Sequence, residues 1–65
     1  MIIVWMATLR DLREKVALSQ EDLAEAARVQ AHTISDIENR KHKPRPSTRR
    51  KIAKALGVRP QDIDW

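Results

Sequence analysis

The fold is decided by the stretch LSQEDLAEAARVQAHTISDIEN, residues 18–39. The same layout occurs in it twice. An apolar residue precedes a polar position at which a helix can begin, and a second apolar residue follows five positions after the first. Leu18 and Leu23 form the first apolar pair, and Val29 and Ile34 form the second pair eleven residues later. This spacing is typical of hydrophobic staples at helix starts and predicts two consecutive short helices.

Each half of the stretch sets the limits of one helix. Ser19 and Asp22 stand at capping-box positions, so the first helix should cover about residues 20–27. The second should cover about residues 31–39, with Gln30 at the capping position. Because only about three residues join them, the two helices should cross steeply.

A further helix is predicted before this pair. Thr8 and Asp11 stand at capping-box positions, and Leu9, Leu12 and Val16 follow at helical spacing. This helix should end near Ala17.

Another helix is predicted after the pair, beyond a basic loop at residues 40–45. Pro46 suits a first helical turn, Ile52 and Leu56 lie on the apolar stripe, and Gly57 stands where a left-handed cap is needed. A last turn should begin at Pro60 and include Ile63, and no segment shows the alternation of a half-buried strand.

The charge distribution favours a polyanionic partner. Residues 1–39 hold four basic and seven acidic side chains, a net charge of −3, whereas residues 40–59 hold nine basic and no acidic ones. The basic block continues into a helical pattern, which favours a positive surface that faces phosphates. Two Trp are the only aromatic residues, which argues against single-stranded nucleic acid and leaves the duplex. The absence of cysteine excludes disulfides, thiol catalysis and cysteine-based zinc sites.

The apolar run at residues 2–6 is much shorter than the roughly 20 residues that span a bilayer. No Lys or Arg precedes it, as one would in a signal peptide. We expect a soluble, cytoplasmic protein.

Taken together, LSQEDLA at 18–24, ISDIEN at 34–39 and KIAKALGV at 51–58 resemble the helix-turn-helix domain of the phage-repressor and Cro family, of the xenobiotic-response-element type. The resemblance covers about residues 8–63. It implies a compact, all-α, five-helix, lambda-repressor-like domain that binds operator DNA, usually as a homodimer. We therefore expect an apolar N-terminal arm at 1–6 and a DNA-binding domain at 7–65, with the helix at 31–39 in the major groove.

Helical geometry supports this orientation independently. On a wheel of about 100° per residue, Ile34 and Ile37 mark the buried side of the helix at 31–39. His32, Asp36 and Asn39 fall on the opposite side, which therefore presents polar groups.

The resemblance assigns base reading to Ala31, His32 and Asp36, and Gln30 and Thr33 complete the candidate set. Ala31 offers only a methyl contact to thymine, or is simply a good helix former. His32 suits a purine edge, with a plain surface residue as the alternative. Asp36 could accept a hydrogen bond from cytosine N4, but an ion pair with Arg40, four positions later, is slightly favoured.

Phosphate contacts are expected at both ends of the DNA-facing surface. The resemblance implies that a glutamine at the start of the helix at 20–27 contacts a phosphate. In the family this glutamine often braces a second one on the next helix, but Ala31 stands at that second position, so the brace is absent. The phosphate candidates are Gln20, Asn39, Arg40, Lys41 and Lys43.

Two further features bear on the structure. The resemblance implies a partly buried ion pair of Arg13 with Glu38, and both lie about 40° from the apolar centre line of their helices. Arg28 and Arg40 stand where the family usually has glycine at positive φ, which costs on the order of 1 kcal/mol and suggests differently shaped turns.

The apolar ends suggest self-association. Ile3, Trp5 and Trp65 are candidates for a dimer contact, in which the arm could pair as a strand across the two-fold axis. The alternatives are that these residues pack onto the core, or that translation begins at Met6.

The leading function is a sequence-specific double-stranded DNA-binding transcriptional regulator, most simply a dimeric repressor. The alternative is an antitoxin-like module that binds a partner protein, with DNA binding secondary. An enzyme is the weakest hypothesis, because His32, Asp36 and Ser35 lie on one helix and cannot converge as a catalytic triad. We expect no catalytic site, no cofactor and no metal, since His32 and Asp36 lack a third ligand.

Overall fold

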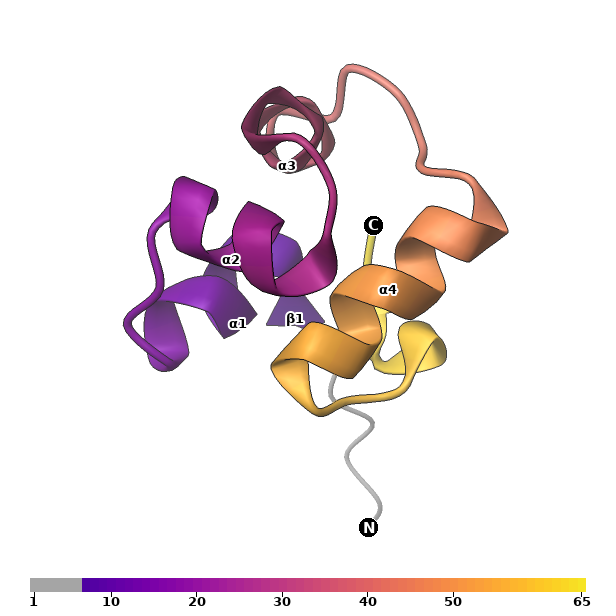
Figure 1. Ribbon diagram of the computed structural model, residues 1–65. Helices are drawn as coiled ribbons and strands as arrows, with labels where there is room; N and C mark the ends of the chain where they lie inside the picture. The colour runs from indigo at the N-terminus through magenta and orange to yellow at the C-terminus, as the bar shows by residue number, and fades with distance from the viewer. Residues whose placement is uncertain (1–6) are drawn as a thin grey trace, which may run out of the picture.

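The computed structural model describes residues 7–65, in which four α-helices enclose one apolar core (Figure 1). The helices are α1 (Leu9–Lys15), α2 (Gln20–Ala27), α3 (Ala31–Glu38) and α4 (Pro46–Leu56). The four predicted helices are confirmed. Two of them end earlier than expected: α1 stops at Lys15 and not near Ala17, and α3 stops one residue before Asn39.

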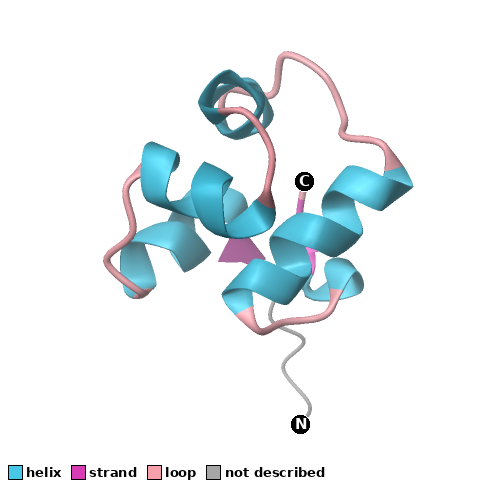
Figure 2. Ribbon diagram, in the orientation of Figure 1, coloured by secondary structure: helices cyan, strands magenta, loops and turns pink. Residues whose placement is uncertain are grey.

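The C-terminal segment differs from the prediction of a fifth helix. Pro60–Asp62 forms only a short 3-10 turn, η1, and Ile63–Asp64 is a strand, β2. This strand pairs in parallel with Ala7–Thr8, β1, so that Ala7 lies opposite Ile63 (Figure 2). The all-α, five-helix expectation is therefore confirmed only in part, because the last turn at Pro60 is present but does not form an α-helix. Three residues are too few for a stable α-helix, and the extended backbone after them places Ile63 in the core with 1% of its surface exposed.

Both capping boxes predicted for the first two helices are present. The Thr8 hydroxyl accepts from the Asp11 amide at 3.1 Å, and the Ser19 hydroxyl accepts from the Asp22 amide at 3.0 Å. In each box the carboxylate accepts in return from the amide of the capping residue. These caps fix the first residues of α1 and α2, whereas Gln30 begins α3 without a side-chain hydrogen bond.

A left-handed residue follows each α-helix. Ala17, Arg28, Arg40 and Gly57 have φ angles of 59°, 59°, 55° and 73°. The amide after each of them bonds back to a carbonyl of the preceding helix at 2.9 to 3.1 Å, the pattern of a Schellman motif. The arginines that replace the family's glycines therefore adopt the glycine conformation, and the turns are not differently shaped.

The core is built around α2, which packs against both α3 and α4. Its centre is nine buried apolar residues: Leu9, Leu23, Ala24, Ala27, Ile34, Ile37, Ile52, Ala53 and Ile63. Val16, which shares the helical spacing of Leu9, is 51% exposed, because α1 has already ended there.

The two central helices cross steeply, as their short connection predicts. Figure 1 shows α3 almost end-on, whereas α2 runs across the view. One side of α3 is thereby held against α2 through Ile34 and Ile37, and its other side faces away from the core.

Glycine at a left-handed position should stabilise the domain. We expect Ala17→Gly to raise the free energy of unfolding and Gly57→Ala to lower it, each by about 1 kcal/mol, because a Cβ is strained at these φ angles. No atom lies within 4 Å of a Cβ built on Gly57, so a loss of stability in Gly57→Ala would reflect backbone strain and not a steric clash.

Chemical denaturation measures both changes. The control is Ala26→Gly within α2, the same substitution at a helical φ, which should destabilise by about 1 kcal/mol. A loss of stability in Ala17→Gly comparable to that of the control would contradict the strain argument.

Candidate nucleic-acid interface

The outward side of α3 carries short polar side chains. His32 and Asn39 are exposed, and Thr33, Ser35 and Asp36 are partly exposed. The Asn39 side-chain amide donates to the Ser35 hydroxyl at 3.3 Å, which leaves its carbonyl oxygen for other partners. Ala31 differs from the rest of the candidate set, because it packs against the core and offers little surface.

Asp36 takes its partners from the loop after α3. Its carboxylate lies 3.9 Å from Lys41 Nζ and 3.5 Å from His42 Nε2. The prediction of an ion pair between Asp36 and Arg40 is therefore wrong. Arg40 has the left-handed conformation that ends the helix, so its side chain does not continue the helical row above Asp36.

Arg40 instead ties the end of α3 to the C-terminal strand. Its guanidinium donates to the Trp65 carbonyl at 3.0 Å and to the Asp64 carboxylate at 3.2 Å. This arginine is thus engaged within the chain, which makes it a weaker phosphate candidate than Lys41 and Lys43, both of which are exposed.

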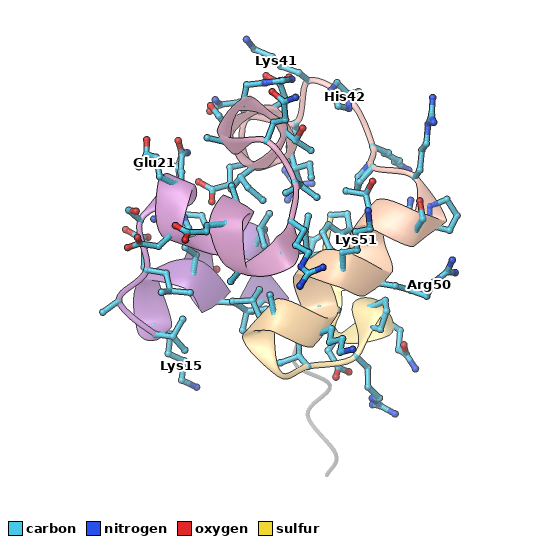
Figure 3. All side chains as sticks on the ribbon, viewed as in Figure 1. Lys15, Glu21, Lys41, His42, Arg50 and Lys51 are labelled. Atoms are coloured by element: carbon cyan, nitrogen blue, oxygen red, sulfur yellow. The ribbon has the colours of Figure 1, made fainter. Side chains whose placement is uncertain are left out.

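The loop that carries these lysines is anchored at its far end. Pro44 is buried, and the Arg49 Nε donates to its carbonyl at 3.2 Å. Figure 3 shows Lys41 and His42 on this loop beside α3. The loop and α3 border a cleft of about 410 Å³, which is lined by Thr33, His42, Lys43, Pro44, Arg45 and Thr48.

Four of the six lining residues were not selected for DNA contact by sequence reasoning: His42, Pro44, Arg45 and Thr48. Arg45 belongs to the basic run, and this charge was the available signal. Nothing in the sequence marks Thr48 as a contact residue, because it lines the cleft together with Thr33 only once the loop and α4 have folded back toward α3.

One buried carboxylate sets the position of α3. The Glu38 side chain has no exposed surface, and its Oε2 accepts from Arg13 Nε at 2.6 Å. Its Oε1 accepts from Arg13 Nη2 at 3.0 Å and from the Gln20 side-chain amide at 3.1 Å. Arg10 lies 3.4 Å away, and Arg13 also donates to the Leu18 carbonyl at 2.8 Å. Glu38 thus joins three helices.

Gln20 has a structural partner that the sequence analysis did not foresee. In the family, the glutamine at this position often braces a second glutamine. Here the side-chain amide of Gln20 donates to the Glu38 carboxylate instead. Gln20 is also the first residue of α2, and the backbone N–H groups at a helix start favour a bound anion.

Two opposing effects act on the pKa of Glu38. Burial raises the pKa, and hydrogen bonds from Arg13, Gln20 and Arg10 lower it more in total, so the pKa of Glu38 lies below its usual value. The ionised pair therefore stabilises the folded chain above the usual glutamate pKa of 4.5, and this stabilisation is lost as the pH falls through the lowered value.

The dimer candidates divide between two regions. Ile3 and Trp5 lie outside the described residues. Trp65 is partly buried against the core, and its indole Nε1 donates to the Pro60 carbonyl at 3.0 Å. The structure thus accounts for Trp65 within one chain, as the packing alternative expected.

Two further properties concern residues 7–65 alone. No helix there is both long enough and apolar enough to cross a bilayer. Within the same range, no three His, Asp or Glu side chains are grouped so that they could hold a metal ion.

Removal of the buried carboxylate should destabilise the domain. We expect Glu38→Ala to lower the free energy of unfolding by about 3 kcal/mol at pH 7, because it leaves the guanidinium of Arg13, whose side chain is only 13% exposed, without its partner. The difference from the unsubstituted chain should narrow as the pH falls well below 4.5, where Glu38 itself becomes protonated.

Denaturant titrations across this pH range measure the effect. The matched control is Glu25→Ala, an exposed glutamate of α2 outside the first helical turn, which should change the stability by less than about 0.5 kcal/mol. Equal stability of the two variants at pH 7 would remove Glu38 from its anchoring role.

Comparison with known proteins agrees with this geometry. The family model described as a helix-turn-helix domain matches residues 7–65. The structure is also similar to the crystal structure of the restriction-modification controller protein C.AhdI from Aeromonas hydrophila, with 30% sequence identity and a TM-score of 0.80 over 83% of this chain and 82% of that one. No curated protein sequence matches. Because the family model covers nearly the whole chain and the solved structure has the same fold, this protein belongs to the helix-turn-helix domain family.

Proposed function

We propose that the chain is a sequence-specific, double-stranded DNA-binding transcriptional regulator that acts as a dimeric repressor. The observation that carries this proposal is the outward side of α3, where exposed polar groups lie beside a cationic loop. An α-helix fits the major groove, where each base pair presents a distinct pattern of donors and acceptors. The name of the similar protein C.AhdI, a controller, supports a regulatory role.

His32 is the strongest candidate for base reading. It lies in the first turn of α3, the part of a recognition helix that reaches base edges, and its imidazole is exposed. Thr33 borders the adjacent cleft and could contact a base or the sugar-phosphate backbone. Gln30 is exposed just before the helix, whereas Ala31 would add at most a methyl contact.

Asp36 is proposed to contact a base from a position beside Lys41. A carboxylate in the major groove is repelled by phosphates, but the Lys41 ammonium lies 3.9 Å from Asp36 and reduces this repulsion. In that setting the Asp36 oxygen can accept a hydrogen bond from cytosine N4.

Phosphate binding is assigned to two sites on either side of α3. On one side, Lys41, Lys43 and Arg45 extend from the loop, with Asn39 beside them. On the other, the start of α2 at Gln20 presents backbone amides. With about 6 to 10 phosphate contacts in a dimer, the slope of log affinity against log salt concentration should be about −5 to −9.

A base contact and a phosphate contact should respond differently to substitution. We expect His32→Ala to weaken binding to the selected operator by about 1 to 3 kcal/mol and to leave binding to random duplex unchanged. Lys43→Ala, the comparison variant, should weaken binding to both duplexes and reduce the salt slope of the dimer by about 2, because one phosphate contact is lost from each subunit.

Fluorescence anisotropy with an operator selected from a random pool measures both effects. If His32→Ala weakened random and selected duplex equally, His32 would have no reading role. The absence of any preferred duplex would contradict the proposed function as a whole.

Dimerisation is proposed to run through the N-terminal arm, since the structure accounts for Trp65 within one chain. We expect Ile3→Asp with Trp5→Asp to shift the chain from dimer to monomer in sedimentation equilibrium. Val16→Asp, which places the same charge at an exposed valine, should leave the dimer intact. In the dimer, recognition helices should lie about 34 to 36 Å apart and give a symmetric footprint. A chain that sediments as a monomer without any substitution would contradict this arrangement.

A further inference from the structure

A second cationic site lies apart from the DNA-facing surface, between the end of α2 and the second half of α4. It is a groove of about 700 Å³. Three alanines and three cations line it: Ala26, Ala27, Ala55, Arg28, Lys51 and Lys54. We call it the α2/α4 groove. None of its lining residues belongs to α3 or to the loop at 40–45.

The cations of the groove have no acidic partner among residues 7–65. Arg28, Lys51 and Lys54 are all exposed, and none takes part in the ion pairs of the described chain. Other basic residues, such as Arg13, Arg40 and Arg59, are paired. The groove therefore keeps its positive charge available for a ligand from outside the chain.

The floor of the groove is apolar. Ala26 is exposed, Ala55 is partly exposed and Ala27 is buried, so the side chains at this floor are methyl groups on which an apolar side chain could pack. Phosphates would gain from the cations but not from this floor, whereas a peptide that combines carboxylates with a large apolar side chain would use both.

We propose that the α2/α4 groove binds an acidic segment of a partner protein, whose carboxylates meet Arg28, Lys51 and Lys54 while an apolar side chain between them contacts the alanines. The regulator would thus bind a second macromolecule on a surface that α3 does not use. This proposal does not depend on DNA recognition, because the groove shares no residue with the proposed base or phosphate contacts.

A designed peptide tests the chemistry directly. The probe is a short fluorescein-labelled peptide in which Asp and Glu flank one Leu and one Trp, and the comparison peptide has Ser in place of Leu and Trp. With the full chain, we expect saturable binding of the first peptide and binding weaker by about tenfold for the second. Amide resonances of Ala26, Arg28 and Ala55 should shift on titration, whereas those of α3 should not.

Charge reversal on a single helix supplies the matched pair of variants. Lys51→Glu with Lys54→Glu should weaken peptide binding by at least about tenfold, whereas Arg50→Glu should change it by less than about twofold. Figure 3 shows Arg50 and Lys51 leaving α4 in different directions, and Arg50 does not line the groove. Thermal melts of the variants establish that each is folded.

Several results would overturn the proposal. They are no saturable binding up to about 1 mM peptide, equal binding of the serine peptide, equal losses in the Arg50 and Lys51 variants, or resonance shifts confined to α3. Displacement of the peptide by duplex DNA would assign the groove to nucleic acid and overturn it as well. A chain that binds the peptide but no preferred duplex would retain this site and lose the proposed function, so the two failures are distinguishable.

Discussion

The buried carboxylate of Glu38 is the interaction on which the interface depends. A charge without exposed surface is costly unless several donors surround it, and here Arg13, Gln20 and Arg10 supply them. These donors come from α1 and α2, so the end of α3 has one favourable position relative to both helices. The exposed side of α3 then has a defined orientation, which recognition of base edges requires.

Cationic side chains are distributed over two separate surfaces of the domain. The loop after α3 places the Lys41 ammonium and the His42 imidazole beside the Asp36 carboxylate. The cations at the α2/α4 groove are unpaired within the described residues and stand over alanine methyl groups. Charge next to an apolar floor favours a protein ligand, whereas charge next to polar helix positions favours DNA.

Sharp chain reversals make so small a domain possible. Each α-helix is followed by a left-handed residue and an amide that bonds back into the helix, so helices of 7 to 11 residues pack with short connections. Three of these four residues are not glycine. The strain at Ala17, Arg28 and Arg40 is offset by the core contacts of the helices that they join.

The helix starts were predictable from the sequence because caps and staples act over three to five residues, as the pairs Ser19 with Asp22 and Leu18 with Leu23 illustrate. The outward side of α3 was also predictable, since helical periodicity alone opposes His32 to Ile34. Local patterns carry no information about contacts between distant segments. The strand pair at Ile63, the bond from Arg40 to Trp65 and the α2/α4 groove therefore became visible only in the tertiary structure, where packing decides which distant groups meet.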